Sequence, residues 1–232
     1  MLILLNPFLY MKKVIARLLH LYKLYIIKDE FTLEIRRWTR DKGDETLRTN
    51  YPELDETSIV FDVGGYQGDF AEKINYKYGC KVYLFEPHPH FYEICLNRFM
   101  NNDMITPLNY GLSDQNGFFT LSDNVDESSF LNPKYKNKSG IKCELKEFSS
   151  TINQLNITNI NLMKINIEGG EYPLLLHMAS TNNLSLVNQY QIQFHTFIKN
   201  ASSMRKKIIT SLSESHHRTW CYTFVWENWK KK

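Results

Sequence analysis

Short apolar runs that stop at glycine, proline or acidic residues recur through the middle of the chain. Runs of this length indicate buried strands, because a strand covered on both faces is apolar throughout instead of alternating. Residues 117–122 are predicted as a short antiparallel addition. The other predicted strands are residues 59–61, 81–85, 105–109, 162–167, 186–195 and 220–226.

Segments with helical character lie between these strands. Strands that alternate with helices at this spacing indicate an α/β fold, a doubly wound and mainly parallel sheet with helices on both faces. Such sheets bind ligands beyond the carboxyl ends of their strands, so candidate site residues are expected there. The predicted helices are residues 31–40, 70–78, 90–100, 171–178 and 204–212.

Residues 123–150 are polar and rich in Lys, Asn and Ser. A long irregular segment in a compact fold is often a lid or a binding loop, and it is as often a variable stretch of surface. Both interpretations stay open.

An amphipathic helix is predicted near the N-terminus. Polar and basic residues interrupt its apolar positions, so no uncharged span of about 18 residues exists and a transmembrane helix is not expected. The helix packs on the domain or on a sister subunit, or it lies on an anionic membrane surface. A polar linker follows, which divides the chain into an N-terminal helical segment, residues 1–57, and a main domain, residues 58–232. The apolar helix positions are Met11, Val14, Ile15, Leu18, Leu19, Tyr22, Tyr25 and Ile26.

Composition and charge narrow the function classes. The 232 residues carry a net charge of +3, and 43% hydrophobic and 23% charged residues are typical of a soluble globular protein. A chain this close to neutral is not expected to bind nucleic acid, which needs a clustered basic face. The four cysteines form no Cys-x-x-Cys pair, so neither a disulfide framework nor a zinc site is predicted, and reduced thiols indicate a cytoplasmic protein.

The stretch SIVFDVGGYQGDF, residues 58–70, is the main candidate for a ligand loop. Gly64, Gly65 and Gly68 follow an apolar strand, and backbone amides in such turns approach ligands closely. Their spacing does not fit the Gly-x-Gly-x-x-Gly pattern of dinucleotide binding. Asp62 would repel a pyrophosphate, but it accepts hydrogen bonds from an ammonium group, directly or through water.

Glu86 ends the next strand, at a place where a carboxylate accepts both hydroxyls of a ribose. The sequence around the glycine loop offers no Lys or Arg to grip a phosphate. The loop and the ribose acid together favour S-adenosyl-L-methionine over NAD as the cofactor.

The chain resembles the FkbM family of S-adenosylmethionine-dependent methyltransferases over residues 59–229. The resemblance rests on ordered motifs at appropriate spacing: VFDVGGYQGDF, YLFEPHP, YGLSD, LMKINIEGGEY, QIQFH and FVWENW. It implies the class I methyltransferase fold, which is Rossmann-like. It also implies methyl transfer, usually to a hydroxyl on a sugar or a sugar-decorated natural product.

The resemblance assigns roles to individual residues. It implies that the glycine loop, with Asp62, holds the methionine part of the cofactor and that Glu86 holds the ribose. Ser113 and Asp114, in the YGLSD motif, are implied to lie beside the adenine, where a carboxylate accepts a hydrogen bond from the exocyclic amine.

Two amides stand where the family usually or often has carboxylates, Asn166 and Gln193. One branch of the family resembles this chain in its NIEGGEY, QIQFH and WENW motifs, so the amides do not imply a loss of activity. The competing enzyme hypothesis, a metal-assisted catechol-type methyltransferase with ligands near Asn166, is disfavoured because divalent cations of this kind prefer carboxylates. No metal ligand set is therefore predicted.

Methyl transfer to an alcohol requires a group that removes the hydroxyl proton. His195, at the end of the fifth strand, is the first candidate for this base, and Glu168 or Glu171 then orients it or the acceptor sugar. Two structural alternatives stay open: a core histidine bonded to the backbone, and a Glu171 that stabilises the N-terminus of a helix. The alternative to an enzyme is a scaffold protein that retains the methyltransferase fold within a glycan-assembly complex.

Overall fold

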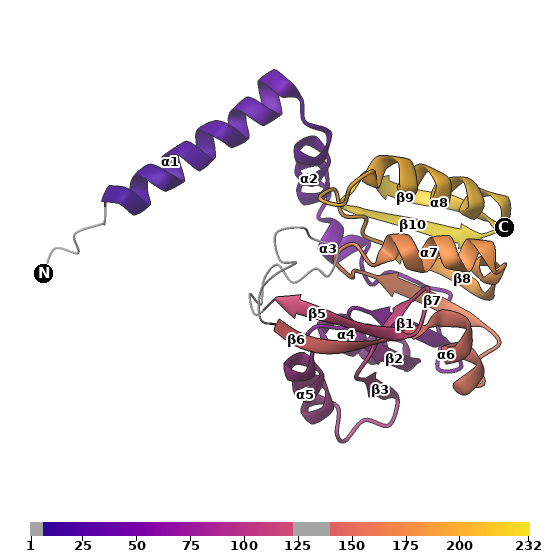
Figure 1. Cartoon of the computed structure of the whole chain (residues 1–232). Coiled ribbons are helices and arrows are strands. Elements are labelled where there is room, and N and C mark those ends of the chain that lie inside the picture. The colour runs from indigo at the N-terminus through magenta and orange to yellow at the C-terminus, as the bar shows by residue number, and fades with distance from the viewer. Residues whose placement is uncertain (1–6, 123–139) are drawn as a thin grey trace, which may run out of the picture.

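The centre of the fold is a seven-stranded sheet (Figure 1). The computed structural model describes residues 7–122 and 140–232. The first five strands in spatial order are parallel, and β10 runs antiparallel to both of its neighbours. The predicted doubly wound, mainly parallel sheet is confirmed. In spatial order the strands are β3 (Ile105–Leu108), β2 (Lys81–Phe85), β1 (Ile59–Val63), β7 (Ile160–Ile165), β8 (Val187–Ile192), β10 (Trp226–Lys231) and β9 (His216–Tyr222).

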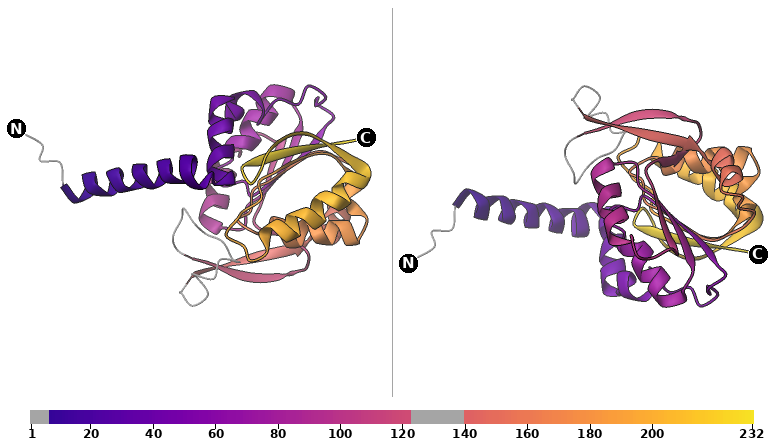
Figure 2. Two further views of the ribbon diagram at one scale, coloured as in Figure 1. Left: turned by 90° about the horizontal axis from the view of Figure 1, so that it is seen from above. Right: turned by 90° about the horizontal axis from the view of Figure 1, so that it is seen from below.

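Helices cover both faces of this sheet (Figures 1 and 2). Alternate strand residues build two cores, because successive side chains of a strand point to opposite faces. Val60 and Leu162 pack with α4 and α5, whereas Phe61 and Met163 pack with α7 and α8. Both faces are therefore buried, as the apolar runs predict. The helices are α2 (Glu30–Arg40), α3 (Gly43–Thr46), α4 (Asp69–Tyr78), α5 (Pro89–Arg98), α6 (Phe148–Gln154), α7 (Glu171–Ser180), α8 (Ala201–Ser215) and the 3-10 helix η3 (Asn183–Leu186).

A second, three-stranded sheet has the order β4 (Gly111–Ser113), β6 (Gly140–Glu147) and β5 (Gly117–Ser122). β5 is the predicted antiparallel strand. The prediction of an irregular segment over residues 123–150 is wrong from residue 140 onward, because that part forms β6 and the first turn of α6. Residues 123–139, the rest of the candidate lid, lie outside the described residues.

The C-terminal part of the chain is a hairpin and not the single predicted strand 220–226. β9 ends at Tyr222 and β10 begins at Trp226. Between them the Val225 amide donates to the Tyr222 carbonyl at 2.8 Å, and Phe224 adopts a left-handed φ of 60°. The apolar run hides this turn because no glycine or proline marks it.

The polar linker packs against this hairpin. The Trp38 ring of α2 meets the edge of Tyr222 with centroids 5.1 Å apart, and the Arg48 guanidinium lies over Trp226 at 3.9 Å. The buried Tyr51 hydroxyl donates to Asn228 Oδ1 at 3.0 Å. Residues 30–51 are thus joined to the sheet, and the domain boundary after residue 57 stays a prediction.

The helix α1 (Pro7–Tyr22) continues into a π-helical segment, η1 (Lys23–Ile27), and both project from the body in every view (Figures 1 and 2). The predicted N-terminal helix is therefore present. Within residues 7–122 and 140–232, no helix has the length and apolar character required to cross a membrane.

Truncation of Phe61 tests the double-sided core. Its side chain is fully buried, and its ring lies 4.9 Å from that of Phe85. We expect Phe61→Ala to lower the free energy of unfolding by about 3–5 kcal/mol, because it removes apolar contact and leaves a cavity. The control Tyr76→Ala, at a 91% exposed position on α4, should change stability by less than about 0.5 kcal/mol. Denaturant titration measures both values, and equal effects would contradict the assignment of Phe61 to the core.

Candidate active site

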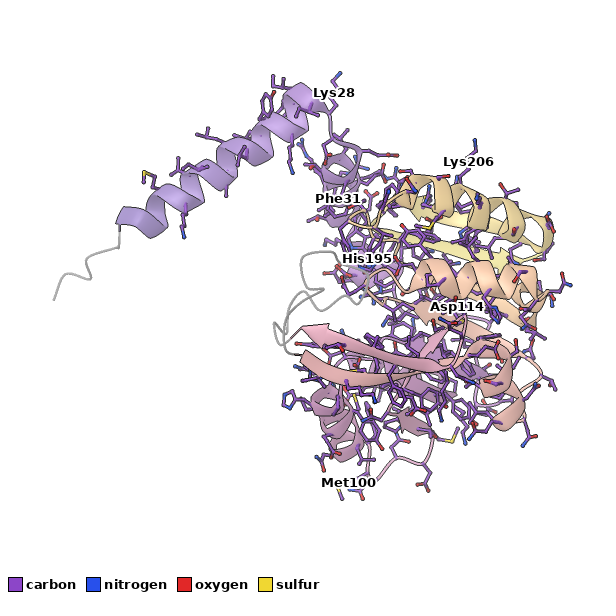
Figure 3. All side chains as sticks on the ribbon, in the orientation of Figure 1. Lys28, Phe31, Met100, Asp114, His195 and Lys206 are labelled. Atoms are coloured by element: carbon purple, nitrogen blue, oxygen red, sulfur yellow. The ribbon has the colours of Figure 1, made fainter. Side chains whose placement is uncertain are left out.

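The carboxyl ends of four neighbouring strands form one edge of the large sheet. In β1, Val63 pairs with Phe85 of β2 and with Ile165 of β7, and Ile165 in turn pairs with Ile192 of β8. The loops that follow these residues therefore lie along the edge where doubly wound sheets bind ligands. Figure 3 shows His195 at this edge.

The glycine loop after β1 takes a conformation that requires glycine. Gly64 and Gly68 have φ values of 83° and 88°, in the left-handed region that disfavours side chains. A Cβ atom at Gly64 would also overlap the backbone carbonyl oxygen of Asn166, and one at Gly65 would overlap Leu84. The loop after β1 thus lies directly against the loop after β7.

A buried ion pair between β1 and β7 stabilises the start of the glycine loop. Lys164 Nζ lies 2.8 Å from Asp62 Oδ1 and donates to the Gly64 carbonyl at 2.7 Å. Asp62 and Lys164 are opposite each other in the β1–β7 register, and both side chains are nearly inaccessible to solvent. Lys164 is therefore a basic residue next to the glycine loop. It was not predicted from the sequence, because only the residues adjacent to the loop in the sequence were considered.

The other carboxylate oxygen of Asp62, Oδ2, is buried and has no hydrogen-bond partner in the described structure. A buried acceptor without a donor is unfavourable, so this atom suits a donor that a ligand supplies. The signal for Lys164 was present in the sequence, as a single charged residue within the apolar run LMKI.

Glu86 is almost fully buried just beyond β2, and its carboxylate contacts the backbone of both adjoining loops. Oε2 accepts a hydrogen bond from the Tyr66 amide at 2.8 Å, and Oε1 accepts one from the His88 amide at 2.9 Å. Burial raises the pKa of Glu86 to about 7. A carboxylate has about four lone-pair sites, so Glu86 can accept from ligand hydroxyls while it holds these loops.

Glu171 is the buried anchor of the β7 and β8 loops. Its Oε2 accepts from the Gly169 amide at 2.8 Å, and its Oε1 accepts from the His195 amide at 2.8 Å. The same Oε1 lies 3.1 Å from His195 Nδ1. The Tyr172 hydroxyl donates to the His195 carbonyl at 2.8 Å. The backbone and ring of His195 are thus held from one side.

Glu168 binds the other ring nitrogen of His195. Its Oε1 lies 3.3 Å from His195 Nε2, and its side chain is 42% exposed, against 11% for His195. Burial by itself would lower the pKa of His195, but the hydrogen bonds and charges of Glu168 and Glu171 outweigh it and raise the pKa to about 9. His195 is therefore a cation at neutral pH, and the group at this site that reaches solvent is a carboxylate.

Glu168 also has a φ of 50°, a left-handed value that is uncommon for a residue with a side chain. Conformations of this kind cost about 1–3 kcal/mol and occur disproportionately at functional sites. The loop geometry thus turns an exposed carboxylate toward His195.

The structure does not bring Ser113 and Asp114 to this edge. Ser113 pairs with Glu147 in the small sheet, and the Glu147 carboxylate lies 2.5 Å from His177 Nε2. His177 is near the C-terminal end of α7, whereas the ligand edge lies at the N-terminal end of that helix, at Glu171. Figure 3 shows Asp114 displaced from His195. The reason is that β4 leaves the large sheet and pairs with β6. Ser113 Oγ instead donates to the neighbouring Asp114 Oδ1 at 2.8 Å.

Asn166 follows β7 beside the glycine loop. Its side-chain Oδ1 is buried and without a hydrogen-bond partner, so it resembles Asp62 Oδ2 in suiting a ligand donor. Among the residues that the structure describes, no group of three His, Cys, Asp or Glu side chains is arranged to hold a metal ion.

The strand order, the glycine loop after β1 and the acid after β2 together define a class I methyltransferase fold. Residues 62–219 match the family model described as the methyltransferase FkbM domain. The chain therefore belongs to the FkbM methyltransferase family, and the family prediction is confirmed.

Several solved structures are similar to this chain at low sequence identity. The N-methyltransferase NodS from Bradyrhizobium japonicum WM9 has a TM-score of 0.45 and 10% identity, with 84% of this chain and 97% of that chain covered. A putative rRNA methylase from Clostridium thermocellum has a TM-score of 0.48 and 9% identity, with 82% and 94% covered. Fibrillarin from Aeropyrum pernix, solved with natively bound S-adenosyl-L-methionine, has a TM-score of 0.46 and 10% identity, with 79% and 69% covered. No curated protein matches the chain.

Two glycine substitutions test the loop after β1. We expect Gly64→Ala to weaken S-adenosyl-L-methionine binding by roughly tenfold or more, because a positive φ and the Asn166 carbonyl both oppose a methyl group. Gly117→Ala is the matched control, since a Cβ there meets nothing within 4 Å. Calorimetric titration measures both affinities, and circular dichroism checks folding. Unchanged affinity in a folded Gly64→Ala variant would remove the loop from the binding site.

The His195 cluster predicts a pH dependence of stability. The folded pKa of about 9 lies above the ordinary value, so the stabilisation is complete below about pH 6.5 and is lost as pH rises through about 9. We expect a loss on the order of 3 kcal/mol across this window. Denaturant titrations at several pH values should show that His195→Gln flattens this slope, whereas the control His217→Gln, at an exposed position, preserves it. The same slope in both variants would contradict a cationic His195.

Proposed function

We propose that this protein transfers the methyl group of S-adenosyl-L-methionine to a hydroxyl oxygen of a sugar or glycoconjugate. The observation that carries the proposal is the cluster of Glu168, His195 and Glu171, which lies in the loops beside the glycine loop of a methyltransferase fold. An alcohol must lose its proton when it is methylated, so an alkylated oxygen requires a proton acceptor at the site.

The residues at the strand ends fit the predicted cofactor. S-adenosyl-L-methionine supplies a methyl group on a positively charged sulfur. The unpartnered Asp62 Oδ2 suits the amino group of the methionine part, directly or through water, and the spare lone pairs of Glu86 suit the ribose hydroxyls. The tight glycine loop allows the backbone to approach the ligand closely.

Glu168 is the proposed proton acceptor. It is the exposed carboxylate of the cluster, and acid–base catalysis requires a group that the acceptor hydroxyl reaches. His195 is the positioning residue: with Nδ1 directed to Glu171 and Nε2 to Glu168, it holds the exposed carboxylate in place. This division reverses the first expectation, in which His195 is the base and a glutamate orients it.

An exposed aromatic ring supports a sugar as the acceptor. Phe197 is 40% exposed, and its ring lies 5.4 Å from that of His195. The apolar face of a pyranose packs well on such a ring, while its hydroxyls reach the neighbouring carboxylate. The resemblance to FkbM proteins points to the same class of acceptor.

Glu168→Gln tests the assignment of the base. The amide has nearly the same shape but accepts a proton far less readily, so we expect turnover to fall by about 10²–10⁴-fold while cofactor affinity stays within a few-fold. The assay incubates the protein with labelled S-adenosyl-L-methionine and a panel of sugars and glycoconjugates, and mass spectrometry detects the added methyl group. Glu214→Gln, at an exposed position near the end of α8, is the matched control for the loss of a carboxylate.

The pH profile separates the roles of the two residues. If Glu168 accepts the proton, His195→Gln retains measurable turnover with a changed pH profile, whereas Glu168→Gln loses turnover at every pH. Normal turnover in Glu168→Gln would overturn the assignment. Failure of every hydroxyl acceptor, with methylation of an amine or thiol acceptor instead, would overturn the proposed substrate class.

A further inference from the structure

The N-terminal helix presents an uncovered apolar surface. This surface, called here the helix face, consists of exposed side chains on α1 and η1. α1 stands away from the body (Figures 1 and 2), and η1 joins it to α2, where Arg36 donates to the Tyr25 hydroxyl at 3.4 Å. Leu18 is 61% exposed and Ile26 is 69% exposed. Figure 3 shows the side chains of α1 extending from a helix that lies apart from the ribbon of the body. The members of the helix face are Met11, Val14, Ile15, Leu18, Leu19, Leu21, Tyr22, Tyr25, Ile26 and Ile27.

The helix face is a continuous stripe along α1. At about 100° of rotation per residue, the apolar positions from Met11 to Tyr22 fall within an arc of about 160°. Lys12 and Arg17 lie outside this arc, toward its two margins. A narrow seam for one partner helix uses only two positions in seven, whereas a stripe of this width suits a flat apolar environment.

The charge of this segment has a single sign. Residues 1–28 contain five Lys and Arg residues and no Asp or Glu, and the first acid is Asp29. The chain as a whole has 28 basic and 25 acidic residues, so the remaining chain carries more acidic than basic side chains. The positive charge is thus concentrated on the element that also carries the helix face.

We propose that α1 and η1 lie flat on an anionic lipid bilayer and hold the methyltransferase body at its surface. The helix face enters the boundary between headgroups and acyl chains, and the long basic side chains reach the anionic headgroups beside it. Tyr22 and Tyr25 suit this boundary, because an aromatic ring with a polar end is favourable there. A second copy of the chain is a poorer occupant, because two such helices bring like charges together.

Vesicle flotation tests this proposal with the 232-residue chain. We expect binding to vesicles of phosphatidylcholine with roughly one third phosphatidylglycerol, weaker binding to phosphatidylcholine alone, and a decline at high salt, because the headgroup attraction is screened. Ile15→Glu combined with Leu18→Glu should abolish binding, because it puts two carboxylates into the helix face. The matched control is Tyr76→Glu combined with Met100→Glu, which adds the same charges at exposed apolar positions of the body.

A second variant tests the electrostatic part. Arg17→Gln combined with Lys23→Gln should weaken binding to the anionic vesicles by about 30-fold, because each basic residue near such a surface contributes about 1 kcal/mol. Its binding to phosphatidylcholine alone should be unchanged. Circular dichroism and thermal unfolding establish that all variants keep the folded body.

Three results would overturn the proposal. The first is equal vesicle binding by the wild type and the folded Ile15→Glu, Leu18→Glu variant. The second is equal binding by the body control and that variant. The third is no vesicle binding by the wild type, together with a concentration-dependent dimer in light scattering that the helix-face variant disrupts; the helix face is then an interface between two copies.

Discussion

The buried pair of Asp62 and Lys164 is the interaction on which the conformation of the candidate cofactor site depends. It joins β1 to β7 at matched positions, and Lys164 also binds the Gly64 carbonyl that begins the glycine loop. Two charges taken out of water are stable only when they are paired and well bonded, and loss of either partner typically costs about 3–5 kcal/mol. The pair therefore ties the conformation of the loop to the pairing of the two central strands.

The proposed acceptor side of the candidate site uses charge in a different way. Two carboxylates hold one histidine, and their different burial separates their roles. Glu171 is fully buried and bonded to the backbone, so it can only hold its neighbours, whereas Glu168 reaches solvent. The raised pKa of His195 follows from this arrangement and makes the ring a poor base at neutral pH. The geometry thus favours the exposed carboxylate as the group that takes a proton.

The apolar residues of the body and those of the N-terminal helix differ in burial. In the body, alternate strand residues are covered by helices on two faces. In α1 and η1, comparable side chains are exposed, and the charges between them are all basic. The cost of this exposure to water is the physical reason to expect a second surface that covers it.

The sequence by itself determined the class of fold and the family, and it predicted a site at the carboxyl ends of the strands. Apolar runs that end at glycines specify parallel strands, and the motifs at the strand ends identify an FkbM methyltransferase. Local patterns carry this information because strand burial and turn conformation depend mainly on adjacent residues. The hairpin at Tyr222 and Trp226 was missed because its turn contains no glycine or proline.

The tertiary structure alone decided which charged groups meet. Lys164 and Asp62 are 102 positions apart in the sequence, and the register of β1 and β7 places them opposite each other. β4 pairs with β6 in the small sheet, so Ser113 and Asp114 lie away from the ligand edge. The pKa of His195 rises because the segment that follows β7 brings two glutamates, Glu168 and Glu171, to the two ring nitrogens of a histidine that follows β8. Protonation states depend on burial and on neighbours in space, so they follow only from the folded chain.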